Sequence, residues 1–327
     1  PPDPVQTGQP GDDAIASQAQ LMETRRIGST GERVTVVGLG GAALDRQSLA
    51  VGQATVRRAL DLGVNFFDTA GGYGESETYL GETLAGEPRD SYVLETKWDG
   101  GAFLKWGGIG LTESVERSLV RMRTDHVDVF LFHMIDAPVY EIHRDRFYPE
   151  VARLKEQGKI RHLGFTQTIK REPKFEGVMK ALEGDPGLWD VVMLKYGIMN
   201  QWAAKAALPL AKKHDIGIVN MAVVRTTLTD PVAMRERLDE WRADGTISSD
   251  ALNGDAPFDW LVDGDVGSVA EAAYRFGAAQ DPMSTVLTGT SNIEHLEANV
   301  AALERGPLPD ADAARLVELL GGSWSPD

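Results

Sequence analysis

The 327-residue chain has no cysteine, no long apolar run and too few basic residues to balance its acidic ones. The absence of cysteine excludes disulfides, thiol catalysis and thiolate metal sites. No apolar run reaches the roughly 18 residues that a membrane-spanning helix needs. The formal net charge of −16 argues against nucleic acid or an anionic membrane as the main partner. A small ligand stays possible, because a local basic pocket can exist in an acidic protein.

Several catalytic motifs are also missing. The sequence contains no G-x-S-x-G, no H-E-x-x-H and no G-x-x-x-x-G-K-[ST]. These are the signatures of serine hydrolases, zinc proteases and P-loop nucleotide-binding proteins. The six histidines are not closely paired, so neither zinc nor another metal is predicted.

The start of the chain differs in composition from the rest. Residues 1–21 are rich in Pro, Gln, Asp and Gly and show no hydrophobic periodicity, which predicts a flexible tail. They lack the apolar core of a secretory signal peptide, and we expect a cytoplasmic protein. Residues 22–327 show no composition break and are expected to form a single domain.

Short segments rich in β-branched and apolar residues alternate with helical patterns along this domain. Several of these segments are nearly continuous apolar runs, as expected for parallel strands covered on both faces. The sequence predicts a (β/α)8 TIM barrel, preceded by a β-hairpin that turns at "GSTGE" and closes the barrel base. The predicted barrel strands are 35–41, 64–68, 92–97, 127–133, 160–166, 191–196, 217–222 and 285–290.

The helical segments show apolar stripes and one expected cap. Thr112 is predicted to be the N-cap of a helix. The longest gap between predicted strands, 223–267, is expected to be a lid or an insertion. Two apolar stripes at helical spacing are Val115, Leu119 and Met122, and Leu296, Val300 and Leu303.

The segment "VTVVGLGGAAL" offers a competing interpretation. Gly38, Gly40 and Ala43 have the G-x-G-x-x-A spacing of a Rossmann fold, a weak signal when it stands alone. Asp68 lies further along the chain than the acidic residue of that fingerprint, and no clear helix opens at the glycines. We therefore interpret these glycines, with Gly41, as a tight loop near a ligand.

Four reactive side chains are expected to meet at the mouth of the barrel. Asp68, Lys97 and His133 end three consecutive predicted strands, and Tyr73 lies in the small-residue loop after Asp68. The carboxyl ends of barrel strands face one shared mouth. Each residue alone has a simpler explanation: a turn cap, an exposed loop aromatic, a lysine that reaches solvent, or a core histidine.

Together the four side chains suit proton transfer to a carbonyl oxygen. A buried lysine needs a counter-charge, and Asp68 supplies one. A phenol with a pKa of about 10 is a poor acid at neutral pH, and a nearby ammonium lowers that pKa. A histidine can orient the carbonyl oxygen by a hydrogen bond. Tyr73 is then the proton donor, and a cofactor must supply the hydride, because no side chain can.

Motifs along residues 22–305 resemble the aldo-keto reductase superfamily. They are "DTAGGYG", "LETK", "VDVFLFH", "GKIRHLGFT" and "VLTGTSNIEHLEAN", in the order and spacing of that family. The resemblance implies a (β/α)8 barrel and NAD(P)H-dependent reduction of an aldehyde, ketone or sugar carbonyl. It also implies a catalytic tetrad of Asp68, Tyr73, Lys97 and His133.

The resemblance assigns cofactor contacts, with departures from the family pattern. Thr166 and Gln167 stand where the family often has Ser-Asn at the nicotinamide carboxamide. Met193 replaces a common Gln, and Met221 replaces an aromatic that stacks on the nicotinamide. The following loop lacks the family's glycines, although Arg225 could pair with a phosphate.

The segment after the last predicted strand is expected to hold the adenosine end. Gly289, Thr290 and Ser291 would approach a phosphate at a helix N-terminus, and Asn299 would meet the adenine. Gly289 and His295 stand where the family often has a Lys and an Arg for the 2′-phosphate. The resemblance still favours NADP(H), with NAD(H) possible.

The remaining expectations concern one more cofactor residue, the substrate and the oligomeric state. Gly41 is also assigned to the cofactor. Trp98 and Met134 are assigned to an apolar substrate wall, although Trp98 could equally be packing at the barrel rim. The partner would be a small carbonyl or alcohol, and the protein a monomer or small homo-oligomer. Two alternatives stay open: a catalytically silent nucleotide-binding regulator, and a lyase or isomerase that retains its nicotinamide.

Overall fold

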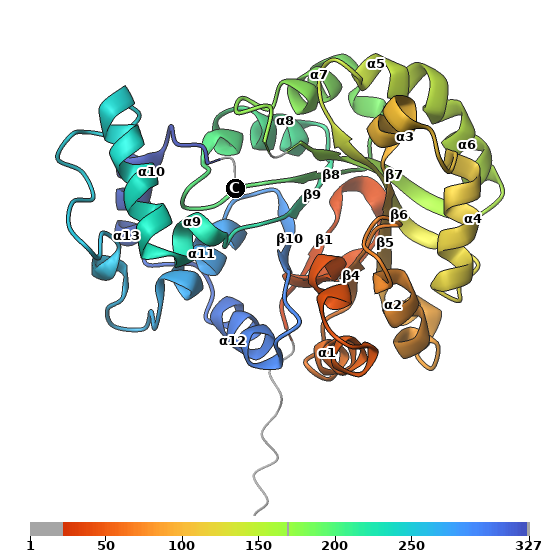
Figure 1. The fold of residues 1–327 in the computed structure, drawn as a ribbon, viewed down its shortest axis with the longest axis horizontal. Helices are drawn as coiled ribbons and strands as arrows, with labels where there is room; N and C mark the ends of the chain where they lie inside the picture. Colours follow the sequence, from red (N-terminus) through yellow and green to blue (C-terminus); the bar gives the residue numbers. More distant parts are fainter. Residues whose placement is uncertain (1–21, 169, 326–327) are drawn as a thin grey trace, which may run out of the picture.

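A closed barrel of parallel strands forms the centre of the computed structural model, which describes residues 22–168 and 170–325 (Figure 1). The strands follow one another around the barrel in the order β10-β3-β4-β5-β6-β7-β8-β9. Each predicted barrel strand overlaps one of them, so the (β/α)8 prediction is confirmed and the Rossmann alternative is wrong. The strands are β3 (Val37–Gly40), β4 (Phe66–Asp68), β5 (Val93–Trp98), β6 (Val127–Ile135), β7 (Ile160–Gln167), β8 (Val191–Leu194), β9 (Gly217–Asn220) and β10 (Met283–Thr288).

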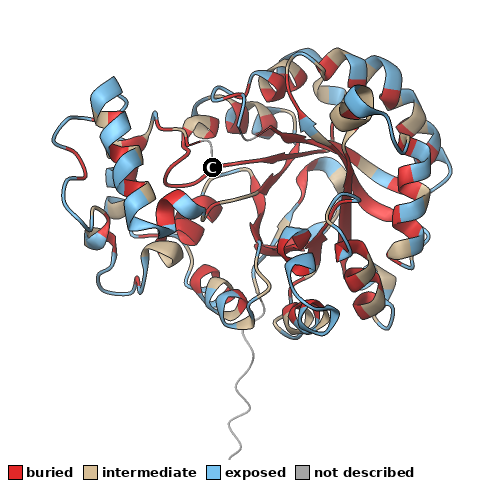
Figure 2. Ribbon diagram, viewed as in Figure 1, coloured by how far each residue is buried: buried red, intermediate tan, exposed pale blue. Residues whose placement is uncertain are grey.

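Apolar side chains fill the barrel and also the layer between strands and helices. Burial is concentrated on the strands and on the inner faces of the helices (Figure 2). Side chains alternate across a strand, so inward positions recur every second residue. The cluster inside the barrel comprises Ile27, Val34, Phe66, Val93, Val129, Leu131, Val191, Met193, Val219 and Leu287.

A hairpin closes the amino-terminal end of the barrel, as predicted. Strand β1 (Thr24–Arg26) pairs antiparallel with β2 (Arg33–Thr35). The hairpin seals the base because Ile27 and Val34 join the cluster inside the barrel. Gly28 has φ +54°, and a Cβ there would lie 2.2 Å from the backbone nitrogen of Gly217, so glycine is required at this contact.

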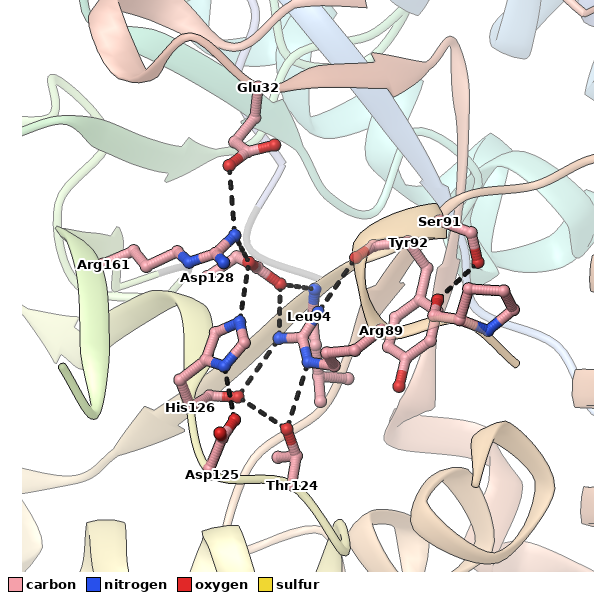
Figure 3. Close-up of polar contacts among 11 residues, drawn as sticks. Glu32, Arg89, Ser91, Tyr92, Leu94, Thr124, Asp125, His126, Asp128 and Arg161 are labelled. Atoms are coloured by element: carbon pink, nitrogen blue, oxygen red, sulfur yellow. Dashed lines mark hydrogen bonds and ion pairs between the residues drawn. The ribbon is translucent and has the colours of Figure 1, made fainter. Parts of the chain in front are cut away.

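A buried aspartate ties three strands together near the same end of the barrel (Figure 3). Asp128 of β6 accepts hydrogen bonds from the backbone nitrogen of Leu94 at 2.8 Å and from Arg89 at 2.6 Å. It also accepts one from Arg161 of β7 at 2.9 Å. The Asp128 carboxylate is thus paired with two arginines at the base of the barrel. These contacts fix how β5, β6 and β7 lie together.

Helices surround the strands, and both predicted apolar stripes are buried. The prediction that Thr112 caps a helix is wrong: the N-cap is Gly110, and the Thr112 hydroxyl donates to Glu150 at 3.0 Å instead. The chain turns through the positive-φ residues Gly107 and Gly108, so that the helix begins at the buried Leu111. The helices are α1 (Leu49–Asp61), α2 (Ser76–Leu84), α3 (Gly100–Trp106), α4 (Leu111–Arg121), α5 (Tyr140–Ile142), α6 (Tyr148–Glu156), α7 (Glu176–Gly184), α8 (Ala207–Lys213), α9 (Thr226–Thr229), α10 (Pro231–Asp244), α11 (Val269–Ala278), α12 (Ile293–Glu304) and α13 (Asp310–Leu320).

The long segment after β9 is a helical insertion that carries α9 and α10 before α11. Figure 1 shows α10 beside α13 at one side of the barrel. Arg315 of α13 lies over the ring of Trp260, 4.1 Å from its centroid, and joins the insertion to the last helix. No helix among the described residues is long and apolar enough to cross a membrane. The single domain over 22–327 stays a prediction, and the tail over 1–21 lies outside the described residues.

Candidate active site

Asp68, Tyr73, Lys97 and His133 meet at the carboxyl end of the strands. Lys97 forms an ion pair with Asp68 across β4 and β5 and donates a hydrogen bond to the carbonyl oxygen of Thr69 at 2.8 Å. Its Nζ lies 4.9 Å from the centroid of the Tyr73 ring. The rings of Tyr73 and His133 lie 5.8 Å apart, nearly perpendicular at 78°. The four side chains therefore form one cluster, as their places at the strand ends predict.

Burial and charge act differently on these groups. Burial would lower the pKa of Lys97, but the neighbouring Asp68 carboxylate, helped by Tyr73 and Glu95, raises it above its usual value. Burial, with the nearby Lys97 ammonium, lowers the pKa of His133 to about 3, so its imidazole is neutral at pH 7. Lys97 thus carries the positive charge of the cluster.

The pKa of Tyr73 departs from the sequence-based expectation. Burial raises it above its usual value, although the Lys97 ammonium opposes this effect as predicted. The expectation of a net lowering was wrong because the sequence gives no measure of how strongly the phenol is withdrawn from water. Tyr73 therefore keeps its proton at neutral pH.

A tight loop carries Tyr73 back over the strand ends. Gly74 has φ +53°, and a Cβ there would lie 1.9 Å from the carboxylate of Asp45. The same carboxylate accepts a hydrogen bond from the backbone nitrogen of Glu75 at 3.0 Å. Thr69 donates to Ser76 across the loop, also at 3.0 Å. The small residues before α2 are thus explained by the sharp turn and by the close approach of Asp45.

Gly74→Ala tests this account of the loop. We expect a loss of about 1–3 kcal/mol in the free energy of unfolding, because the new Cβ needs both a strained φ and displacement of Asp45. Urea unfolding measures it. Gly72→Ala is the matched control, since a Cβ there meets nothing within 4 Å and its φ is not positive. Equal stability of the two variants would contradict the account.

A cavity of about 660 Å³ runs from Asp68 and Tyr73 along the carboxyl ends of the strands. Residues that sequence reasoning did not assign to it include Arg46, Glu271 and Tyr274, which are close to it only in the folded chain. Met193, noted above as a departure from the family pattern, also lines it. The predicted cofactor residues on its wall are Met221, Arg225, Gly289, Thr290, His295 and Asn299.

The chemistry of this wall fits a nicotinamide dinucleotide. Met193 and Met221 line the same cavity as Tyr73, and a methionine side chain can cover the face of an aromatic ring. Arg46 and Arg225 can pair with phosphates, and Gly289 and Thr290 lie just before the N-terminus of α12, where anions bind well.

Four predicted cofactor residues do not line the cavity. Gly41 packs behind the Tyr73 loop, where a Cβ would lie 2.5 Å from Ser76 Oγ, and Gly40 lines the cavity instead. The hydroxyl of Thr166 accepts from the backbone nitrogen of Met134 at 2.7 Å. The others use their oxygens elsewhere: Gln167 accepts from the backbone of Lys195 at 3.0 Å, and the Ser291 carbonyl accepts from Thr55 at 3.3 Å.

The two predicted substrate residues have different surroundings. Trp98 is buried, its ring 4.8 Å from that of Phe147, and its Nε1 donates to the carbonyl oxygen of Ile109 at 3.0 Å. These contacts favour the alternative of packing at the barrel rim. Met134, next to His133, is 39% exposed at the mouth.

Glu95 is a further residue of the cluster that sequence reasoning missed. It precedes Lys97 by two positions on β5 and is fully buried. The alternation of side chains along the predicted strand was a signal that could have found it, because residues two apart share a face. Among the described residues, no group of three His, Cys, Asp or Glu side chains could hold a metal ion.

Comparison with known proteins gives a consistent result. The model of the Aldo/keto reductase family matches residues 36–320. L-galactose dehydrogenase of Arabidopsis thaliana is 28% identical over 304 residues, which cover 86% of this chain and 88% of that protein. NADH-specific methylglyoxal reductase of Escherichia coli is 27% identical over 340 residues, which cover 90% of this chain and 97% of that protein.

A solved structure agrees in fold. The holo form of aldo-keto reductase AKR11C1 from Bacillus halodurans superposes with a TM-score of 0.71 at 22% identity, covering 93% of this chain and 98% of that one. The family match spans the barrel and all four clustered residues. This chain belongs to the aldo/keto reductase family and is an oxidoreductase.

Proposed function

We propose that this chain reduces an aldehyde, ketone or sugar carbonyl to an alcohol, or catalyses the reverse, with a nicotinamide nucleotide as hydride carrier and Tyr73 as proton donor. One observation carries the proposal. Asp68 and Tyr73, which both contact Lys97, line a cavity that continues to Gly289 and Asn299. A proton donor and a nucleotide-sized space therefore adjoin.

Each clustered residue has a role that follows from its surroundings. Bound NAD(P)H supplies the hydride. Tyr73 holds the proton, because burial raises its pKa, and the Lys97 ammonium stabilises the phenolate left after donation. Asp68 fixes Lys97 through their ion pair. His133 is neutral and close to Tyr73, so it can hydrogen-bond the same carbonyl oxygen and orient it.

NADP(H) is the proposed cofactor, with NAD(H) possible. Arg46 and Arg225 line the cavity, and neither is in an ion pair with another described residue. His295 adds a further nitrogen donor at the adenosine end. The E. coli relative is NADH-specific by name, so NAD(H) is the rival outcome.

A fluorescence titration with NADPH and NADH in parallel tests the proposal, followed by turnover on a panel of aldehydes, ketones and sugars. We expect saturable binding, tighter for NADPH, and oxidation of the bound nucleotide by at least one carbonyl. Failure to bind either nucleotide would overturn the proposal. Binding without turnover on the panel would favour a silent regulator, and an isomeric product without net nucleotide oxidation would favour a lyase or isomerase.

Arg225→Ala should weaken nucleotide binding by about 10- to 100-fold, because a hydrogen bond to a charged group contributes about 1.5–3 kcal/mol. The same titration measures the change. Arg117→Ala is the control, since Arg117 pairs with Glu113 on the surface of α4. If Arg225→Ala binds as tightly as the parent, the loop after β9 does not hold the phosphates.

The substrate is proposed as a small carbonyl compound or alcohol without further identity. A cytoplasmic location and a monomeric or small homo-oligomeric state stay predictions.

A further inference from the structure

Glu95 is a carboxyl group buried inside the barrel beside the proposed proton donor. It lies between Val93, which belongs to the apolar cluster inside the barrel, and Lys97. Its relative exposure is 0%, and its carboxyl oxygens have no partner with good hydrogen-bond geometry among the described residues, although the carboxyl group of Asp68 lies close enough to interact with it. Its backbone is paired with that of Asp68 on β4. A second carboxyl group thus lies behind the Asp68–Lys97 pair, and the mechanism above does not use it.

The surroundings of Glu95 disfavour a negative charge. An ionised carboxylate without hydrogen bonds is costly in an apolar interior, and such a group takes up a proton instead. Burial is the main cause that raises the pKa of Glu95 well above its usual range, and the Asp68 carboxylate adds to it. Lys97 opposes both effects.

The charged and titratable groups around Glu95 come from few elements. Asp68 ends β4, Lys97 lies on its own strand, and Tyr73 comes from the loop above. The other neighbouring strand, β6, contributes the apolar Leu131 to the barrel interior and has the neutral His133 near its end. The single ammonium of Lys97 therefore faces Asp68, Glu95 and Tyr73, three groups that become negative when they lose a proton.

We propose that Glu95 is a positioning residue that holds a proton at neutral pH and leaves the Asp68 carboxylate alone to pair with Lys97. When the pH rises, Glu95 releases this proton to solvent, and its new charge opposes ionisation of the Tyr73 phenol. The two acids then titrate as a coupled pair. This inference rests on the proposed role of Tyr73 and deepens it.

The consequence concerns the direction of proton transfer. Reduction of a carbonyl needs the phenol, whereas oxidation of an alcohol needs the phenolate as base. Glu95 and Tyr73 both interact with the Lys97 ammonium. Once Glu95 is ionised, its negative charge opposes ionisation of Tyr73 and extends the pH range in which Tyr73 keeps its proton. Glu95 thus extends the reducing form of the site toward alkaline pH.

The test titrates tyrosinate absorbance in the parent, Glu95→Gln and Glu95→Asp, each corrected by the same protein carrying Tyr73→Phe. In Glu95→Gln we expect the pKa of Tyr73 to fall by about one unit, since a like charge has been removed. Glu95→Asp keeps an acid and should titrate close to the parent. The alkaline limb of kcat for reduction should move in parallel, which loss of packing alone would not produce.

Infrared spectroscopy at neutral pH supplies a second readout. The parent should show a protonated carboxylic acid band that is absent from Glu95→Gln. An ionised Glu95 at neutral pH, or an unchanged Tyr73 titration in Glu95→Gln, would overturn the proposal. If Glu95→Gln does not fold, Glu95→Met, which also lacks an ionisable group, takes its place in both experiments. Neither readout needs turnover, so a protein that shows both effects but reduces no carbonyl would refute the proposed function and leave this inference standing.

Discussion

Tyr73→Phe lowers kcat for carbonyl reduction by about 10²- to 10⁴-fold, the range that a positioned general acid contributes. The phenylalanine keeps the ring that contacts His133 and Lys97 but has no proton to donate. Nucleotide binding should stay near the parent value, because the contacts proposed for the phosphates lie elsewhere along the cavity. Steady-state kinetics with saturating nucleotide measures the loss.

Two further measurements sharpen this prediction. Tyr148→Phe, on α6, removes a hydroxyl from a residue that does not line the cavity and is the matched control. The pH profile of the parent should lack a limb near 6.5, where an ordinary histidine titrates, because the pKa of His133 is lowered to about 3. Turnover of Tyr73→Phe within a few-fold of the parent would assign the acid to another group.

Lys97→Met should cost about 3–5 kcal/mol of unfolding free energy in addition to turnover. The reason is the partner left behind: Asp68 is 3% exposed, and an unpaired buried charge is strongly destabilising. The double variant Asp68→Asn/Lys97→Met should recover much of this stability, since both charges are gone, yet stay inactive. Urea unfolding of Lys97→Met, of Asp68→Asn and of the double variant gives the coupling energy.

A surface pair provides the comparison. Lys155 pairs with Asp190 at 3.2 Å, and both side chains are partly exposed. Lys155→Met should cost about 1 kcal/mol or less, because exposed ion pairs contribute little. A double variant no more stable than Lys97→Met would show that the loss came from packing and not from the isolated charge of Asp68.

Much of the candidate site could be predicted from the local sequence. Asp68, Lys97 and His133 could be brought together before any coordinates, because parallel barrel strands end at one mouth and each residue ends a recognisable strand. The loop to Tyr73 could be anticipated from its small residues. Contacts between distant segments could not. Arg46 and Tyr274 line the cavity through their places in the fold, and Gly40 rather than Gly41 faces it.

The sequence by itself determined the barrel, its hairpin base and the four clustered side chains, since all follow from short-range periodicity and the order of strand ends. Tertiary structure alone decided how far each group is withdrawn from water. That degree of burial raises the pKa of Tyr73 despite Lys97, buries Trp98 and makes Glu95 a buried acid. Desolvation depends on every neighbour that surrounds a group, and those neighbours come from distant parts of the chain.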